Sequence, residues 1–163
     1  RRFEEAVAEA DRAIGLDRSR KDAWEYRARS RFAVGRIEDG VRSTIAERYR
    51  EHASAVGAAV DRGGPEAGLR ELLALTGTWP ERSEVSWRRA AWLAVLGEDE
   101  AAIDALEEAL RLRNVNLMFL AIDPLYVRLH GHPRFRAVVR SMGLETARDT
   151  TSEYRSTLGI GPR

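Results

Sequence analysis

The side chains best suited to metal chemistry lie in one short tract towards the carboxyl end of the chain. His130 and His132 are separated by a single residue, and Asp123 lies close enough in sequence to complete a trio. A zinc site usually needs three or four placed ligands, and neither a cysteine nor a nearby glutamate adds to this set. We therefore interpret the two histidines as surface residues of a loop before Pro133, and we predict no metal.

The other candidates for catalysis are equally sparse. His52 stands alone on a predicted helix, where we expect a partly exposed side chain rather than a catalytic base. The sequence contains no GxSxG motif, no recognisable arrangement of serine, histidine and aspartate, and no glycine-rich loop for phosphate. We therefore predict no catalytic residue and no cofactor. An enzyme is less favoured than an interaction module or a structural segment.

Arginine supplies nearly all of the positive charge, since Lys21 is the only lysine among 27 basic residues. Closely spaced arginines that could contact nucleic acid are Arg27, Arg29, Arg31, Arg88 and Arg89. Acidic residues interleave with them, and the net charge of the whole chain is only +1. No global basic field would attract nucleic acid, so we expect no such partner and interpret these arginines as a solvated face.

The elements that carry these residues are predicted to be helices. The chain has 163 residues, of which 44% are hydrophobic and 33% charged, as expected for one domain whose helices each have an apolar stripe and a polar face. It has no cysteine, so disulfides and thiolate chemistry are excluded. The longest apolar runs, such as residues 117–122, are too short to cross a bilayer, and we expect no membrane span.

The clearest structural pattern is a helical hairpin between Ser86 and Asn114. Four residues share one face of its first helix at the spacing i, i+3, i+4 and i+7: Trp87, Ala90, Ala91 and Ala94. Gly97 is suited to end that helix, because glycine tolerates a left-handed conformation. Acidic residues begin a second helix and arginines end it, as the helix dipole favours. Small residues on the facing stripes allow the two helices to approach closely.

The same pattern occurs elsewhere in the chain, which indicates stacked hairpins. An isolated hairpin leaves one apolar side uncovered, so further hairpins must pack against it. The N-terminal stretch FEEAVAEADRAIGLD repeats the stripe of the hairpin's second helix, with Ala6, Ala10 and Ala13 in the places of Ala102, Leu106 and Ala109. The stretch KDAWEYRARSRFAVGRIEDGV offers a further pair of helices separated by Gly35.

These stretches resemble the tetratricopeptide repeat, a unit of about 34 residues that forms a helix pair. Its pattern is an aromatic early in the first helix, a small residue four places on, a glycine at the turn, and small residues down the second helix. The matching positions are Trp24, Ala28, Gly35, Ile37 and Gly40 in one copy, and Ala90, Gly97, Asp99, Ala102, Leu106 and Ala109 in the other. Arg27 and Arg89 depart from the pattern, because they stand where the repeat often has leucine.

The resemblance implies an all-α fold, a right-handed superhelical stack of antiparallel helix pairs. In this family the first helix of each pair lines a concave groove that binds a peptide. The residues that this register places in the groove are Asp22, Glu25, Arg29, Phe32, Glu84, Trp87, Ala91 and Val95. We interpret Trp24, Trp87 and Trp92 mainly as packing residues, with a groove-lining role as the alternative. Trp79, in a loop before Pro80, is left open between the two.

Helical spacing and capping residues place the individual elements. We predict helices over residues 3–15, 23–34, 38–62, 65–75 and 84–96, with Asp22 and Ser83 as caps. Gly63 and Gly64 end the long helix and Pro65 opens the next. Because residues 38–62 exceed an ordinary repeat helix in length, that helix either leans across its neighbour or passes an irregular joint.

We divide residues 1–144, the predicted repeat domain, into four parts. These are N-terminal repeats (1–62), a linker helix and loop (63–82), the hairpin (83–114) and short capping helices (115–144) that hide the terminal apolar face of the stack. Residues 145–163 are polar and include Gly159, Gly161 and Pro162, so we expect a flexible tail.

The tract FLAIDPLYVRLHGHPRFRAVVRSMGL, residues 119–144, resembles the C-terminal module that follows the repeats in many bacterial signalling proteins. The matching positions are Asp123, Pro124, Leu129, Pro133, Arg134, Phe135, Met142, Gly143 and Leu144. In such proteins the repeats are attached to winged-helix regulators, adenylate cyclase-like domains or serine/threonine kinase domains. The resemblance implies that this chain is a fragment of a larger signalling or regulatory protein.

We therefore expect a non-catalytic module for protein–protein interaction or scaffolding, whose partner is a protein or peptide bound in the groove. The alternative is a structural or oligomerising segment that links domains, in which case the chain forms homo-oligomers. We expect a cytoplasmic location, or an extracytoplasmic one if a targeting or membrane segment lies elsewhere in the parent protein.

Overall fold

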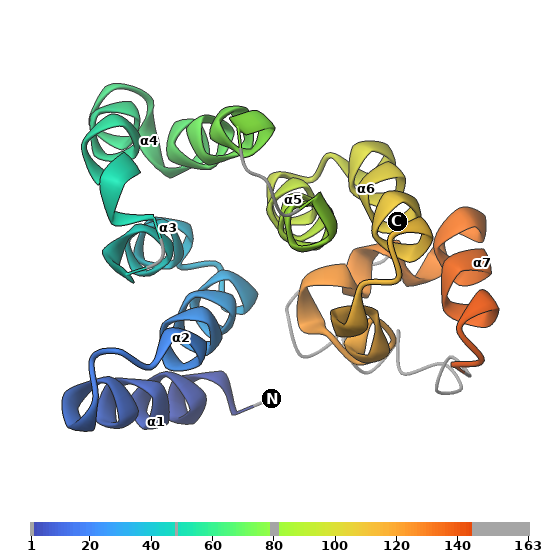
Figure 1. Ribbon diagram of the computed structural model, residues 1–163, viewed down its shortest axis with the longest axis horizontal. Coiled ribbons are helices and arrows are strands. Elements are labelled where there is room, and N and C mark those ends of the chain that lie inside the picture. The colour runs from blue at the N-terminus through green and yellow to red at the C-terminus, as the bar shows by residue number, and fades with distance from the viewer. Residues whose placement is uncertain (1, 48, 79–81, 145–163) are drawn as a thin grey trace. The chain divides into compact units, whose positions relative to one another are not determined.

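The computed structural model describes residues 2–47, 49–78 and 82–144 (Figure 1). Over these residues every regular element is a helix and no strand occurs, so the predicted all-α class is confirmed. The predicted tail at 145–163 and the undecided Trp79 lie outside the described residues.

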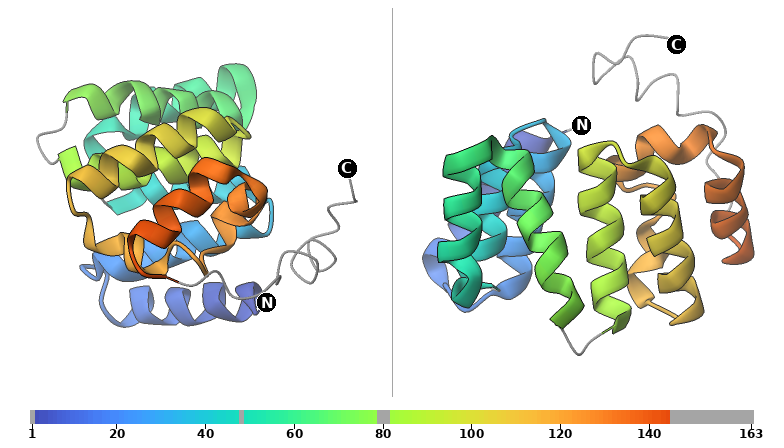
Figure 2. Two further views of the ribbon diagram at one scale, coloured as in Figure 1. Left: turned by 90° about the vertical axis from the view of Figure 1, so that its right-hand side faces the viewer. Right: turned by 90° about the horizontal axis from the view of Figure 1, so that it is seen from above.

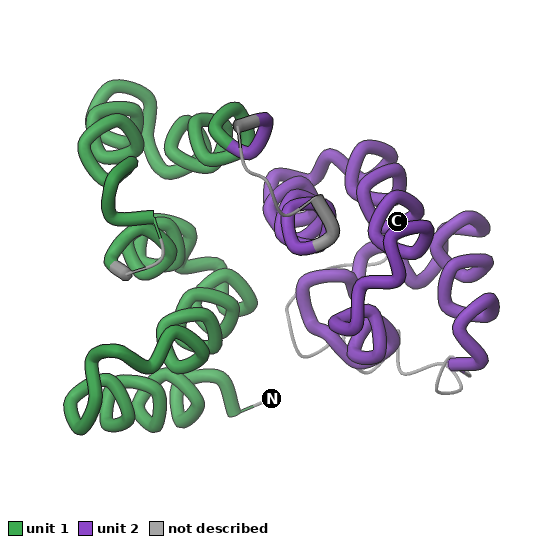
Figure 3. Tube along the Cα trace, in the orientation of Figure 1, with its two compact units in different colours: residues 1–75 green, residues 76–163 purple. Residues whose placement is uncertain are grey.

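The chain forms two compact units, Arg1–Leu75 and Thr76–Arg163 (Figure 3). The division falls inside the segment 63–82 that the sequence marks as a linker helix and loop. Each unit has its own buried residues and is described by itself.

The first unit consists of consecutive helices, each packed against the next. They are α1 (Phe3–Leu16), α2 (Lys21–Ala33), α3 (Ile37–Glu47), the short 3₁₀ helix η1 (Arg50–His52) and α4 (Ala53–Leu75). Trp24 on α2 packs with Ile14 of α1, and its indole Nε1 donates to the carbonyl of Arg18 at 3.1 Å. This bond satisfies the one polar group of a buried ring and ties α2 to the turn that precedes it.

A glycine allows α2 and α3 to approach closely. A Cβ atom placed on Gly40 would lie 2.3 Å from the ring of Phe32, so only glycine fits beside that ring. Gly35, in the turn between the two helices, has a φ of 78°, which is the left-handed conformation predicted for a helix end.

Two predictions for this unit are wrong. Asp22 is not the cap of α2, because the helix already begins at Lys21 and the Asp22 carboxylate instead pairs with Arg20 at 2.8 Å. Residues 38–62 are not one continuous helix, because α3 ends at Glu47 and Tyr49 has non-helical dihedral angles before η1 and α4, which confirms the alternative of an irregular joint. Apolar spacing did not locate this joint, since the buried Tyr49 keeps its place in the apolar stripe although the backbone has left the helix.

The glycine break that the sequence places after residue 62 is confirmed. Gly64 interrupts α4 with a φ of 79° and a ψ of −178°, and Pro65 begins the second part of that helix. Gly68, in the second part, lies against Val60 and Val41, where an added Cβ would come within 2.5 Å of the Val60 side chain. The two parts of α4 are therefore in contact across the kink.

The second unit is built on the predicted hairpin. Its elements are η2 (Thr76–Thr78), α5 (Arg82–Leu96), α6 (Asp99–Arg111), η3 (Val115–Phe119), η4 (Pro124–Gly131) and α7 (Pro133–Ser141). Figure 2 shows α5 and α6 side by side and antiparallel, joined at Gly97, whose φ is 77°. The side chains of Ala90, Ala102, Leu106 and Ala109 are completely buried, as the small-residue stripes predict. Because α5 begins at Arg82, Ser83 lies inside the helix, and its side chain is outside the described residues.

Short helices follow α6 and pack back onto the hairpin, with η4 against α5 and α7 against α6. Tyr126 is fully buried, its ring centroid lies 5.4 Å from that of Trp87, and its hydroxyl donates to the Trp87 carbonyl at 3.4 Å. Phe135 is also fully buried, 6.3 Å from Tyr126 between ring centroids. A line of three aromatic rings thus connects α5, η4 and α7.

We expect Phe135→Ala to lower the free energy of unfolding by about 3–5 kcal/mol, because it removes a buried ring that no other side chain can replace. Urea denaturation followed by tryptophan fluorescence measures this change. Phe119→Ala is the matched control, since the Phe119 ring is 46% exposed and its loss should cost much less. Equal effects of the two substitutions would contradict the packing of α7 described above.

Candidate functional site

The four predicted groove residues of the first unit lie on α2 but differ in exposure. Asp22 is exposed, whereas Glu25 and Arg29 are half-buried and form an ion pair at 3.8 Å. Phe32 is only 7% exposed and packs against Gly40 of α3, so its ring is unavailable to a peptide. The face of α2 therefore offers charged groups but not the aromatic anchor assigned to Phe32.

The four predicted residues of the second unit lie on α5. Glu84 contacts Arg88 and Asn116, each at 3.4 Å. Trp87 and Ala91 are 5% and 2% exposed, and Val95 is half-buried. The ring of Trp87 packs against Tyr126 of the same unit. The interpretation of Trp24, Trp87 and Trp92 as packing residues is confirmed, because all three are buried.

One exposed aromatic was missed by the sequence analysis. Tyr26 is 62% exposed, and on the helical wheel of α2 it shares a face with Asp22, Glu25 and Arg29. The signal was its position opposite the buried Trp24 and Ala28 stripe, but the family register directed attention to Phe32. We define Asp22, Glu25, Tyr26 and Arg29 as the α2 face.

The residues considered for metal binding have structural roles instead. Asp123 is buried and caps η4, accepting from the Leu125 amide at 3.0 Å. His130 is not a loop residue, because it lies within η4 and stacks on Phe135 with ring centroids 5.3 Å apart. In the part of the chain that the structure describes, no three His, Cys, Asp or Glu side chains are arranged to hold a metal. His52 has a 25% exposed side chain, as expected.

The prediction of a solvated arginine face is wrong for Arg88 and Arg27. Arg88 is 7% exposed, and the side chain of Arg27 is 17% exposed. Arg89 donates to the hydroxyl of the buried Thr76 at 2.7 Å. The spacing of arginines along the chain could not show this, because it does not reveal which side chains of neighbouring elements pack against them.

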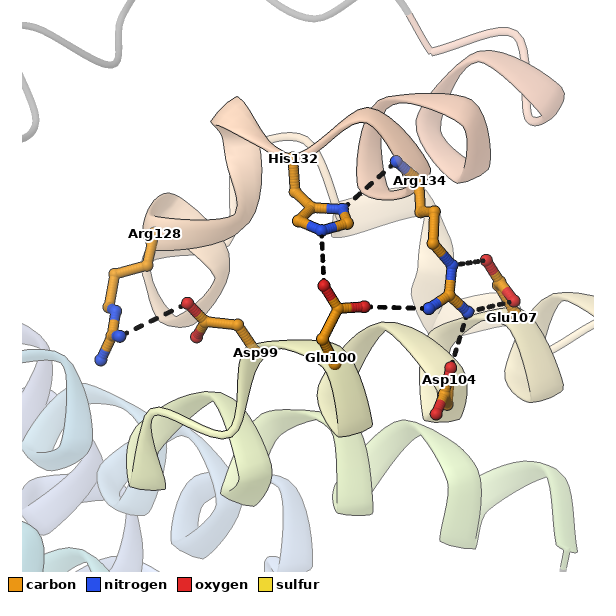
Figure 4. A network of polar contacts seen from close by, with 7 residues as sticks. All are labelled: Asp99, Glu100, Asp104, Glu107, Arg128, His132 and Arg134. Carbon is orange, nitrogen blue, oxygen red and sulfur yellow. Dashed lines mark hydrogen bonds and ion pairs between the residues drawn. The ribbon is translucent and has the colours of Figure 1, made fainter.

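The most extensive polar network of the second unit joins α6 to η4 and α7 (Figure 4). Arg134 donates to three acidic side chains of α6: Glu100 at 3.0 Å, Asp104 at 2.6 Å and Glu107 at 2.8 Å. Arg128 pairs with Asp99 at 3.4 Å. The hydrogen bonds that Arg134 donates to Glu107 and Asp104 raise the pKa of Arg134 above its ordinary value. The acidic face of α6 is thus the docking surface for the arginine at the start of α7.

His132 connects the same network to the cap of α7. Its Nδ1 accepts from the Arg134 amide at 3.3 Å, so Nε2 carries the proton and donates to Glu100 at 2.8 Å. The His132 side chain therefore caps α7 and contacts α6. This arrangement accounts for both nitrogens without a metal.

Comparisons with known proteins show no match to this chain among protein-family models, curated proteins or solved structures. A search of the described residues finds no helix with the length and apolar character needed to cross a membrane. The sequence and the geometry above are therefore the basis for any functional proposal.

We expect Arg134→Gln to lower the melting temperature, because Glu100, Asp104 and Glu107 would be left close together without their shared cation. The effect should shrink as salt is added, since these groups are partly exposed and screened. Arg140→Gln is the control, because it makes the same change of charge on the exposed side of α7. An identical melting temperature for both variants at low salt would show that the network contributes nothing.

We expect His130 to make the second unit less stable in mild acid. Burial lowers the pKa of His130 below its ordinary value of 6.5, so the folded state favours the neutral ring. The contribution of His130 to the free energy of unfolding is complete above pH 6.5. It is lost as the pH falls from that value through the pKa of the folded state, because the unfolded state then binds the proton more readily.

The measurement is the free energy of unfolding between about pH 7.5 and 5, compared for the wild type and His130→Gln. The difference in free energy of unfolding between the wild type and His130→Gln should narrow as the pH falls. Phe119→Ala is the control, because it changes no titratable group and its difference from the wild type should stay constant over this range. A constant gap for His130→Gln would contradict the role of burial.

Proposed function

We propose that this chain is a non-catalytic protein-interaction or scaffolding module. The observation that carries the proposal is the α2 face, where Tyr26 is 62% exposed between charged residues while Trp24, Phe32 and Tyr49 of its unit are buried. Tyrosine and arginine are the residue types that most often anchor protein interfaces. An exposed tyrosine beside the Glu25–Arg29 pair suits an extended segment that carries both an apolar and a polar side chain.

We further propose that the helix pairs belong to a tetratricopeptide-like, right-handed superhelical stack that η4 and α7 cap. Consecutive packing of α1 to α4, the left-handed glycines at 35 and 97, and the contact of α7 with α6 support this architecture. The parent protein would be a bacterial signalling or regulatory protein, and the proposed location is the cytoplasm. These last two points rest on the resemblance of residues 119–144 alone.

A second candidate function is self-association, as in a segment that links domains. It is favoured by four large apolar side chains in and just after η3 that are between 46% and 75% exposed: Val115, Met118, Phe119 and Ile122. Exposed apolar patches often mark contacts between proteins. We name these four residues the η3 patch.

We expect the wild-type chain to retain partners from a lysate of its source cells, and Tyr26→Ser/Arg29→Glu to lose them. The first change removes the aromatic anchor and the second reverses a charge, and both leave the buried residues of α2 intact. Circular dichroism checks that the variant still folds. Met118→Ser/Ile122→Ser is the matched control, because it removes comparable apolar surface outside the α2 face.

The Met118→Ser/Ile122→Ser variant also tests the second candidate function, self-association. Light scattering coupled to size exclusion measures the mass of each protein. Retention of the same partners by the α2 variant would refute the α2 face. Loss of partners only in the η3 variant, or a dimer that this variant abolishes, would favour the η3 patch instead.

A further inference from the structure

Two arginines of the first unit converge on one neutral oxygen. Arg27 and Arg31 are four residues apart and share a face of α2 that differs from the face of Tyr26. Arg27 Nε donates to the hydroxyl of Ser43 at 3.1 Å, and Arg31 donates to the same oxygen at 3.0 Å. Ser43 lies on α3, is completely buried, and donates its own proton to the Asp39 carbonyl at 2.7 Å. A neutral hydroxyl oxygen thus accepts hydrogen bonds from two guanidinium groups.

The charges around this point are not all paired. Arg27 has Asp11 of α1 at 2.7 Å, and Arg36 has Asp39 at 2.6 Å. Arg36 also lies 3.7 Å from Glu4. Arg31 forms no ion pair with any carboxylate among the described residues.

Arg31 is also incompletely hydrogen-bonded. Its acceptors within the described chain are the Ser43 hydroxyl and the Asp39 carbonyl, the latter at 3.4 Å. Its Nε is buried and has no acceptor among the described residues. Burial and the neighbouring Arg27 lower the pKa of Arg31, which shows that its surroundings disfavour the charge. A half-buried cation left in this state costs stability.

We propose that Arg27 and Arg31 form a binding site for a carboxylate, supplied by an acidic side chain or the C-terminus of a polypeptide partner. This site rests on the proposed interaction function and names the chemistry that its partner would carry. An oxyanion beside the Ser43 hydroxyl would accept from both guanidinium groups and would give Arg31 the partner it lacks. Charge-assisted pairs of this kind are stronger than bonds to a neutral hydroxyl.

A carboxylate fits this position better than a phosphate. It brings one negative charge, which matches the single unpaired cation, whereas a phosphate dianion would add charge close to Asp11 and Asp39. The planar carboxylate also matches the fork of a guanidinium. Arg27 is held in place for this contact, because its guanidinium lies 4.6 Å from the centre of the Trp24 ring and is bonded to Asp11.

The test uses the whole chain with ¹⁵N-labelled arginine and follows the Nε–H signals by NMR. The probes are the α-methylamide of N-acetylglutamate, which carries a single carboxylate, its neutral analogue the α-methylamide of N-acetylglutamine, and inorganic phosphate. We expect a saturable shift of the Arg27 and Arg31 signals with the glutamate methylamide only, or with phosphate more weakly. In Arg31→Met the shift of the Arg27 signal should need at least about tenfold more ligand, the loss of one charged hydrogen bond.

Arg12→Met, an exposed arginine of α1, controls for the change of net charge and should bind as the wild type does. Circular dichroism confirms folding, and Arg31→Gln replaces Arg31→Met if the latter does not fold. The proposal is overturned if the α-methylamide of N-acetylglutamate gives no saturable shift, if the Arg31 variant binds it equally well, or if phosphate binds more tightly. Because the probes are small molecules, such a result refutes this site without bearing on the capture of partners through the α2 face.

Discussion

Both units depend on one constraint, which is that short amphipathic helices are stable only when a neighbour covers their apolar stripe. The helices α1 to α3, α5 and α6 have between 11 and 15 residues, a length at which an isolated helix is marginal in water. Close approach makes the burial efficient. It is achieved by alanine on α5 and α6 and by Gly40 beside Phe32 on α2 and α3. The turns at Gly35 and Gly97 bring the stripes together, so the glycine positions control the packing as much as the apolar residues do.

The polar groups between helices follow two different patterns. Around Arg134, three carboxylates of α6 surround one cation, and the neighbouring His132 uses both ring nitrogens, so this network holds α7 in a defined place. Between α2 and α3, Arg27 and Arg31 share the Ser43 hydroxyl instead. Leucine is common at the position of Arg27 in the repeat that the sequence resembles, and an apolar contact would avoid the cost of desolvating the charge. The first pattern serves packing, and the second leaves capacity for a ligand.

Whether an aromatic residue serves packing or is available for recognition depends on whether a neighbouring element covers its side chain. Trp24, Trp87, Tyr126, Phe32 and Phe135 all have buried rings, since each lies where two or more elements meet. Tyr26 remains exposed because it lies on the side of α2 away from α1 and α3. A surface with one aromatic among charged residues favours a partner chosen by charge and hydrogen bonding rather than by a large apolar contact.

The sequence by itself determined the helical class, the hairpin at Gly97, the break at Gly64 and the packing role of Trp24, Trp87 and Trp92, because apolar periodicity and glycine positions are local signals. It offered an irregular joint within residues 38–62 as one alternative but did not place it at Tyr49, since an apolar stripe can continue while the backbone leaves the helix. The register of the resemblance also placed Phe32 and Trp87 in the groove, whereas Phe32 packs against Gly40 and Trp87 against Tyr126. The tertiary structure alone paired Arg134 with α6, partly buried His130 against Phe135 and brought Ser43 of α3 between Arg27 and Arg31. Each of these outcomes depends on which side chain faces a neighbouring helix, and a shift of one residue in register turns that direction by about 100°.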